Sequence, residues 1–115
     1  MDRFPVYIVD SKVFGDPTPD KTRPAIFFNW KDGKIWLLGV YSERDRFSRY
    51  PEQYYKIEDK SVVPLTGEAD SFVWIGKVVR ITMDDFRKIK TKDLNELSFN
   101  DSSNLTSRFN AYYSE

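Results

Sequence analysis

Two polar side chains that could take part in catalysis or binding lie where hydrophobic runs begin or end. Arg23 is followed by Pro24, where a loop rich in proline and aspartate (15–22) gives way to an apolar run, and Ser42 follows the next apolar run. A guanidinium stays charged at every working pH, and its planar fork matches two oxygens of a phosphate. Arg23 and Ser42 are therefore candidates for acting on a phosphate group. The alternative is a solvated loop arginine and a turn hydroxyl that caps local backbone.

Two further segments carry the residue types that bind single-stranded nucleic acid. Between residues 44 and 50, arginines alternate with aromatic residues, a mixture that pairs with phosphates and stacks on bases. A second segment is net positive and contains Lys77, Arg80, Arg87, Lys88, Lys90 and Lys92. We expect Arg44, Arg46, Lys77 and Arg80 to contact RNA. Acidic neighbours nearly cancel the charge of the first segment, so a solvated surface is the alternative for both.

The composition excludes many catalytic designs. The chain has no cysteine and no histidine, which rules out thiolate nucleophiles, zinc–thiolate sites, serine-hydrolase triads and histidine-based nucleases. Adjacent acidic residues such as Asp84 and Asp85 point apart, so we expect no metal and no other cofactor. Eighteen basic residues balance eighteen acidic ones, and a nucleic acid would have to be held by a local patch.

Length and composition indicate one folded domain over residues 1–115. Hydrophobic residues make up 40% of the chain and aromatic residues 17%, too many for a disordered tail. No apolar run approaches the roughly 18 residues of a membrane helix. The first residues place Asp2 and Arg3 before a strand-like run, which is unlike a signal sequence. We therefore expect a cytoplasmic protein with no membrane partner.

The elements that must position these side chains are mainly short strands. Runs rich in β-branched and aromatic residues predict strands over 4–9, 24–30, 34–41, 53–58 and 71–82. The turn at 31–33 contains Asp-Gly and predicts a hairpin, because glycine accepts positive φ. The last strand is expected to bend at Gly76. The tryptophans on these strands are expected in the core or a dimer interface: Trp30, Trp36 and Trp74.

Helices are expected mainly at the C-terminus. Residues 42–52 are polar and alternate in charge, which predicts a long connection rather than a helix. A single helical turn is expected within 84–89, capped by one of its aspartates. A longer helix is expected from about residues 101–103, with one apolar stripe made by Leu105, Phe109 and Tyr112. Together these elements favour a mainly β fold, a small antiparallel barrel with a C-terminal helix, because closure removes sheet edges.

The order of the elements resembles the MazF/PemK family of toxin endoribonucleases. In that family a first strand ends in an aspartate-bearing turn, a loop follows, and an Arg-Pro pair opens the next strand. The similar segments here are YIVD (7–10), GDPTPDKT (15–22) and RPAIFF (23–28). Ser42, after WLLGVY (36–41), is similar to the Ser or Thr that follows the next strand in the family.

The resemblance implies an SH3-like barrel that forms a homodimer and cuts single-stranded RNA as the toxin of a type II toxin–antitoxin pair. RNA can be cut without metal, because its 2′-hydroxyl attacks the adjacent phosphate once a base takes the proton and a cation stabilises the added charge. Arg23 would be that cation, and Ser42 would donate a hydrogen bond to the same phosphate. The protein partner would be an antitoxin whose acidic and hydrophobic tail folds over the RNA groove.

Two features leave the function open between classes. The proton acceptor could be Asp16, Asp20, Glu43, Asp45 or no side chain at all. The sequence also has Gly76-Lys77 where the family usually has Asp-Gln. The alternative function is a non-catalytic SH3-like module that binds a peptide or protein in a groove of exposed tyrosines: Tyr50, Tyr54 and Tyr55.

Overall fold

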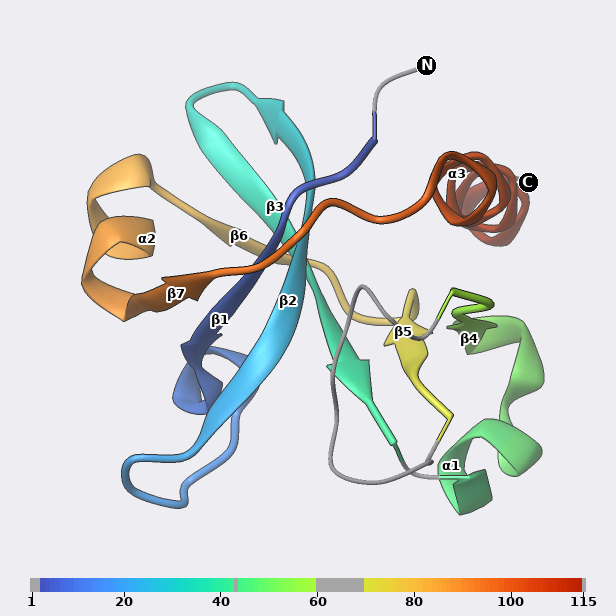
Figure 1. The fold of residues 1–115 in the computed structure, drawn as a ribbon, viewed down its shortest axis with the longest axis horizontal. Coiled ribbons are helices and arrows are strands. Elements are labelled where there is room, and N and C mark those ends of the chain that lie inside the picture. Colours follow the sequence, from blue (N-terminus) through green and yellow to red (C-terminus); the bar gives the residue numbers. More distant parts are fainter. Residues whose placement is uncertain (1–2, 43, 60–69, 115) are drawn as a thin grey trace.

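An antiparallel sheet of seven strands forms the body of the molecule, and helices flank it (Figure 1). The computed structural model describes residues 3–42, 44–59 and 70–114, apart from the side chains of residues 44–46. The strands are β1 (Val6–Asp10), β2 (Thr22–Lys31), β3 (Lys34–Tyr41), β4 (Tyr54–Lys56), β5 (Phe72–Trp74), β6 (Val79–Ile81) and β7 (Lys90–Asp93). The helices are α1 (Arg44–Arg49), α2 (Met83–Ile89) and α3 (Phe99–Tyr113), with 3-10 turns η1 (Ser11–Phe14) and η2 (Pro51–Gln53). The fold is therefore mixed α/β rather than mainly β.

The sheet is open, so the predicted closure into an SH3-like barrel is wrong. The strand order is β4-β5-β3-β2-β1-β7, and β6 pairs with β3. Among the described residues, β4 pairs only with β5 and β7 only with β1, so the two end strands do not meet. These end strands have only three and four residues. The β7 sequence KTKD is exposed throughout, and its charges protect this open edge from pairing with another chain.

The predicted hairpin of β2 and β3 is confirmed. Its turn residues Asp32 and Gly33 both have positive φ, 54° and 75°, as the tight turns that suit twisted strands require. On the other edge of β2, β1 pairs antiparallel and sets Val9 opposite Arg23. The loop predicted from the prolines and aspartates separates β1 and η1 from β2. Arg23 therefore lies at the start of a central strand, beside that loop.

The run 71–82, predicted as one bent strand, forms two separate strands. β5 pairs with Val40 and Tyr41 at the end of β3, whereas β6 pairs with the beginning of β3 at 35–37. The break falls at Gly76, where a Cβ atom would collide with the side chains of Gln53 and Trp74. The chain thus turns away from β3 between the two strands. This turn carries Lys77.

The predicted connection over 42–52 is wrong, because it contains helix α1 and the turn η2. The helix has one described apolar anchor, Phe47. Its ring stacks on Phe72 of β5 at 4.4 Å between centroids and meets the Tyr54 ring edge-on. One aromatic side chain that contacts rings on β4 and β5 leaves no periodic pattern in the helix sequence.

The C-terminal helix is confirmed and begins two residues earlier than predicted. Ser98 caps it, since its hydroxyl accepts a hydrogen bond from the Asp101 N–H at 3.0 Å. Leu105 and Phe109 are buried as the stripe predicts, and Tyr112 packs at the edge of the same cluster. None of the helices in the described ranges is both long and apolar enough to span a bilayer.

Helix α2 is longer than the single turn predicted and is followed by the unpredicted strand β7. Its cap is Thr82 rather than an aspartate, with Thr82 Oγ1 accepting from the Asp85 N–H at 3.2 Å. Phe86 is the buried residue of this helix and meets Tyr7 and Phe27 edge-on. β7 is polar throughout, so it shows no strand alternation in the sequence.

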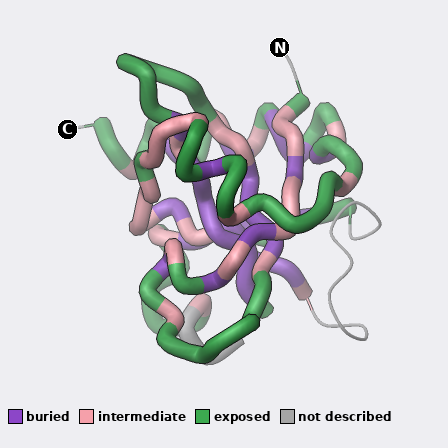
Figure 2. The backbone as a smooth tube through the Cα atoms, turned by 90° about the vertical axis from the view of Figure 1, so that its left-hand side faces the viewer, coloured by how far each residue is buried: buried purple, intermediate pink, exposed green. Residues whose placement is uncertain are grey.

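The two faces of the sheet support two buried clusters. Neighbouring residues of one strand alternate between them: Leu37 belongs to the cluster covered by α2, and Leu38 to the cluster covered by α3. Figure 2 shows the buried residues gathered in the centre of the molecule, with exposed loops around them. α2 and α3 accordingly lie on opposite sides of the sheet (Figure 1).

The segment at residues 3–10 is hydrogen-bonded to the segment at residues 90–102. β7 pairs with β1, and Arg3 Nε donates a 2.6 Å hydrogen bond to the carbonyl of Leu97. The N–H of Phe4 donates to the hydroxyl of Ser102 at the start of α3. Residues more than ninety positions apart thus complete one side of the sheet.

Asp101 is a buried carboxylate that ties α3 to the end of β4. It accepts hydrogen bonds from the Tyr55 hydroxyl at 2.6 Å, from the N–H groups of Glu58 and Asp59 at 2.9 and 3.0 Å, and from the Ser98 hydroxyl at 3.0 Å. Burial alone would raise the pKa of Asp101, but these donors outweigh it and hold the pKa below 3.8. Burial and the same contact raise the pKa of Tyr55.

Asp101→Asn is expected to lower the free energy of unfolding by about 2–3 kcal/mol at neutral pH, because hydrogen bonds to a charged acceptor contribute about that much. Since the folded-state pKa lies below the unfolded value, the contribution is fully present above that unfolded value and disappears as the pH falls through the folded one. Urea unfolding of both proteins from about pH 6 to about pH 3 should show the larger loss in wild type.

The matched control is Asp84→Asn, which changes an exposed aspartate near the start of α2 and should alter stability little at any pH. Parallel pH curves for wild type and Asp101→Asn would contradict the role given to Asp101.

Candidate functional site

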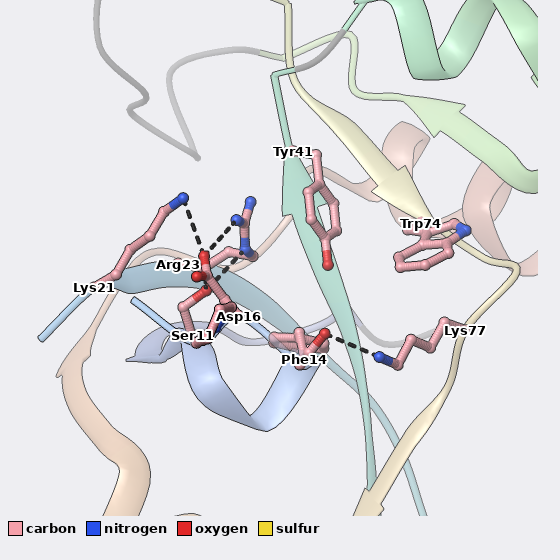
Figure 3. Close-up of a pocket in the computed structure, with 10 residues that line it drawn as sticks. Ser11, Phe14, Asp16, Lys21, Arg23, Tyr41, Trp74 and Lys77 are labelled. Atoms are coloured by element: carbon pink, nitrogen blue, oxygen red, sulfur yellow. Dashed lines mark hydrogen bonds and ion pairs between the residues drawn. The ribbon is translucent and has the colours of Figure 1, made fainter. Parts of the chain in front are cut away.

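A pocket of about 290 Å³ opens between η1, the following loop, and the turn between β5 and β6 (Figure 3). Its walls carry three cationic side chains, one carboxylate, one serine hydroxyl and three aromatic rings: Lys21, Arg23, Lys77, Asp16, Ser11, Phe14, Tyr41 and Trp74. Such a surplus of positive charge suits an anionic ligand. In the described part of the chain, no three acidic side chains come close enough to hold a metal ion.

Arg23 is held on three sides. Its Nη1 donates to the carbonyl of Val40 at 3.2 Å, its Nε donates to Ser11 Oγ at 3.4 Å, and the Tyr41 ring covers its face at 3.9 Å. The remaining nitrogen, Nη2, lies 3.8 Å from Asp16 Oδ2. Only 15% of the side chain is exposed. The guanidinium is therefore fixed in place, with Nη2 on the side of the Asp16 carboxylate.

Gly39 makes room for the ring that covers Arg23. Residues 39 and 41 lie on the same face of β3, and the Tyr41 ring folds back over the glycine. A Cβ on Gly39 would stand 2.9 Å from a ring carbon of Tyr41 and 3.3 Å from Phe14. A side chain at position 39 would push the ring away from Arg23.

The opposite wall is built around Trp74. Its ring stacks on Tyr54 at 6.0 Å and an interplanar angle of 8°, and its Nε1 donates to Gln53 Oε1 at 3.2 Å. Lys77 Nζ lies 5.8 Å from the Trp74 ring and donates to the carbonyl of Phe14 at 2.9 Å. This last bond joins the β5–β6 turn to η1 and keeps a second cation in the pocket (Figure 3).

Asp16 carries the negative charge of the pocket. Its Oδ1 accepts from the Thr18 N–H at 2.9 Å, while Oδ2 lies 3.0 Å from Lys21 Nζ and accepts from the Ser11 hydroxyl at 3.2 Å. The hydrogen bond from Thr18 and the ammonium of Lys21 hold the pKa of Asp16 far below its ordinary value. Asp16 is thus fully ionised at neutral pH and is a weak base.

No family model and no curated protein matches this chain. Any functional conclusion therefore depends on the geometry of the pocket.

The structure brings together three of the residues predicted from the sequence: Arg23, Lys77 and the candidate base Asp16. Ser42 is exposed directly after Tyr41 and is not part of the pocket wall. Arg80 lies elsewhere, on β6, with its guanidinium 4.6 Å from the Trp36 ring.

The remaining predicted residues either do not line the pocket or have side chains outside the described residues. Arg44 and Arg46 belong to α1, but their side chains lie outside the described residues. Among the candidate bases, Asp20 is exposed on the loop with φ of 60° and does not line this pocket. Glu43 and the side chain of Asp45 are also outside the description.

The basic residues between 77 and 92 do not form one face. Arg80 stacks on Trp36, which packs against the cluster under α3, whereas α2 covers the other side of the sheet. Arg87 pairs with Asp84, and Lys90 pairs with Asp93. Arg80 and the basic residues of α2 therefore lie on opposite sides of the sheet.

Sequence reasoning missed several pocket residues. Ser11, Lys21 and Tyr41 were given no role, and Trp74 was expected in the core or an interface. The available signal was Gly39, two residues before Tyr41, which marks a position where a ring can fold over the strand. Trp30 is 58% exposed on the hairpin, so it does not belong to the core of this chain.

The predicted groove of three exposed tyrosines is wrong. Tyr54 and Tyr55 are only 2% and 6% exposed, while Tyr50 is 49% exposed. Because neighbouring side chains of β4 point to opposite faces, Tyr54 packs on Trp74, whereas the Tyr55 hydroxyl donates to Asp101. Neither ring is available to a peptide.

Replacing Gly39 with Ala is expected to cost about 1–3 kcal/mol of stability, because the added methyl group forces the Tyr41 ring to move. In a Tyr41→Val background the same change should cost less than about 1 kcal/mol. Urea unfolding of the four proteins measures both values. Equal costs in the two backgrounds would show that the ring is not the obstacle.

Proposed function

We propose that this protein is a metal-independent endoribonuclease that cleaves single-stranded RNA, and that it acts as the cytoplasmic toxin of a type II toxin–antitoxin pair. The observation that carries the proposal is the immobilised guanidinium of Arg23 in a pocket shared with Lys21 and Lys77. The order of elements around Arg23, which resembles the MazF/PemK family, supports it. The open sheet is a difference from the barrel implied by that resemblance.

The proposed reaction needs a fixed cation more than any other group. The RNA 2′-hydroxyl loses its proton and its oxygen forms a bond to the adjacent phosphorus. The bond from phosphorus to the 5′-oxygen breaks, and that oxygen takes up a proton. The products are a 2′,3′-cyclic phosphate and a 5′-hydroxyl. Negative charge grows on the phosphate oxygens in the transition state. Arg23 is held by Ser11, Val40 and Tyr41 before any ligand arrives, so it meets this charge without reorganising.

Lys21 and Lys77 extend the anion-binding site on either side of Arg23. Lys21 already lies against a carboxylate oxygen, and Lys77 stands on the wall of Trp74. Phosphates flanking the cleaved one would be bound there, with a base beside the aromatic wall; base stacking on an aromatic ring contributes about 1–3 kcal/mol. Ser42, which is exposed directly after Tyr41, would donate a hydrogen bond to the cleaved phosphate.

The proton of the 2′-hydroxyl is assigned to no side chain. Asp16 is the one carboxylate that lines the pocket among the described residues, and its depressed pKa makes it a poor acceptor. Arg44 and Arg46 on α1 would continue the RNA path beyond Ser42. Arg80, which lies beside Trp36, has the least support among the proposed RNA contacts.

The proposed protein partners follow from the same charges. An antitoxin tail rich in acidic residues would neutralise the three pocket cations, and its ordering on binding would cost part of the affinity. A homodimer remains part of the proposal on the basis of the family resemblance. The peptide-binding alternative loses its main support, because Tyr54 and Tyr55 are buried.

Arg23→Ala is expected to slow RNA cleavage about 100- to 1000-fold, the usual effect of removing one preorganised donor from a developing oxyanion. A long natural single-stranded RNA is incubated in EDTA with wild type or variant, and fragment ends are identified by primer extension and mass spectrometry. Arg87→Ala, on exposed α2, is the matched control and should cleave like wild type. Intact RNA at micromolar wild-type protein would refute the proposed activity.

Lys77→Gln is expected to weaken binding of RNA and to reduce its salt dependence. For single strands the slope of log K against log salt changes by about 0.7 per phosphate contact. Binding of a 2′-O-methyl oligonucleotide, which has no attacking hydroxyl, is measured at several salt concentrations. Lys88→Gln is the control with the same loss of charge, and equal slopes for both variants would contradict a phosphate contact at Lys77.

A further inference from the structure

The Asp16 carboxylate occupies the position in which a phosphate would meet Arg23 and Lys21. Its Oδ2 lies 3.0 Å from Lys21 Nζ, 3.2 Å from Ser11 Oγ and 3.8 Å from Arg23 Nη2. Carboxylates and phosphates are bound by the same ammonium and guanidinium donors. An incoming phosphate that uses these donors must therefore compete with Asp16.

The two partners of this contact are held very differently. Arg23 is on β2 in the sheet and is fixed by a backbone carbonyl, a hydroxyl and an aromatic face. Asp16 is on the loop before β2, and its 3.8 Å distance to Arg23 is longer than a direct hydrogen bond. A ligand can thus take the place of the carboxylate without disturbing the guanidinium.

The Thr18 contact would survive such an exchange. Asp16 uses Oδ1 to accept from the Thr18 N–H, a local turn within the loop, and uses the other oxygen for Lys21 and Ser11. The loop can therefore keep its local shape while Oδ2 gives up its partners.

We propose that Asp16 is a displaceable internal substitute for the substrate phosphate, and that it makes the pocket selective for anions that also reach Lys77 and the aromatic wall. This inference rests on the proposed function, since it concerns the same pocket. A tethered carboxylate competes at high effective concentration, so a lone phosphate ion displaces it poorly. A longer RNA strand gains contacts beyond Arg23 and Lys21 and overcomes the competition. Asp16 is thus a specificity-determining residue that works by competition for the cationic donors.

The test is a titration with inorganic phosphate at low ionic strength, followed by the amide signals of Gly15 and Thr18 and the Arg23 Nε–H signal in NMR spectra. Asp16→Asn should bind phosphate roughly tenfold more tightly than wild type, as expected from removing one competing charge about 4 Å away. Asp20→Asn removes the same charge from the same loop but does not touch the pocket, and should change the affinity less than about twofold.

Two results would overturn the proposal: equal phosphate affinity in wild type and Asp16→Asn, or an equal gain in Asp20→Asn, which would indicate a general charge effect. Asn can still accept the Thr18 hydrogen bond. If Asp16→Asn does not fold, Asp16→Ser, whose hydroxyl can also accept from Thr18, is measured against the same expectations.

Failure of the proposed nuclease activity remains distinguishable, because phosphate binding needs no cleavage. With an RNA that the wild-type protein cleaves as the substrate, Asp16→Asn should lower KM and leave kcat unchanged. A collapse of kcat would instead make Asp16 the proton acceptor and overturn the competitive role.

Discussion

The pocket depends on one constraint, the division of β3 between two partners on the same edge. Its first half pairs with β6 and its last two residues pair with β5, so the chain between β5 and β6 must leave the sheet and return. That excursion places Trp74 and Lys77 opposite η1. Gly76 permits the turn, and Gly39 permits the Tyr41 ring between the two walls. The pocket is thus formed by the chain connections that the strand pairing requires.

Two carboxylates with depressed pKa values serve opposite purposes in this framework. Asp101 is enclosed by hydroxyl and backbone N–H donors, and it fixes the start of α3 to the end of β4. Asp16 has charged partners, Lys21 and Arg23, at the margin of an open pocket. Neutral donors around a buried charge favour a permanent structural link. Charged donors beside a cavity favour exchange with another anion.

Local sequence predicts those features whose causes are local. The Asp32-Gly33 turn specifies the hairpin, and the stripe of α3 predicts its buried face. The helix α1 could not be predicted, because the described contacts that anchor it are with the rings of Tyr54 and Phe72 on other elements. β7 has no alternation because both of its faces are exposed. Arg23 was identifiable from its position before Pro24, whereas Tyr41 and Trp74 acquire their places only through long-range packing.

The pairing of β1 with β7 affects the order of folding events during protein synthesis. β1 leaves the ribosome well before β7 and the Leu97 carbonyl that receives Arg3. Contacts of such long sequence separation form late and slow folding. Every residue of the pocket is translated before this closure, but the cluster under α3 cannot be completed without the final helix. This fold, and with it a lasting pocket, is therefore stable only after α3 has been made.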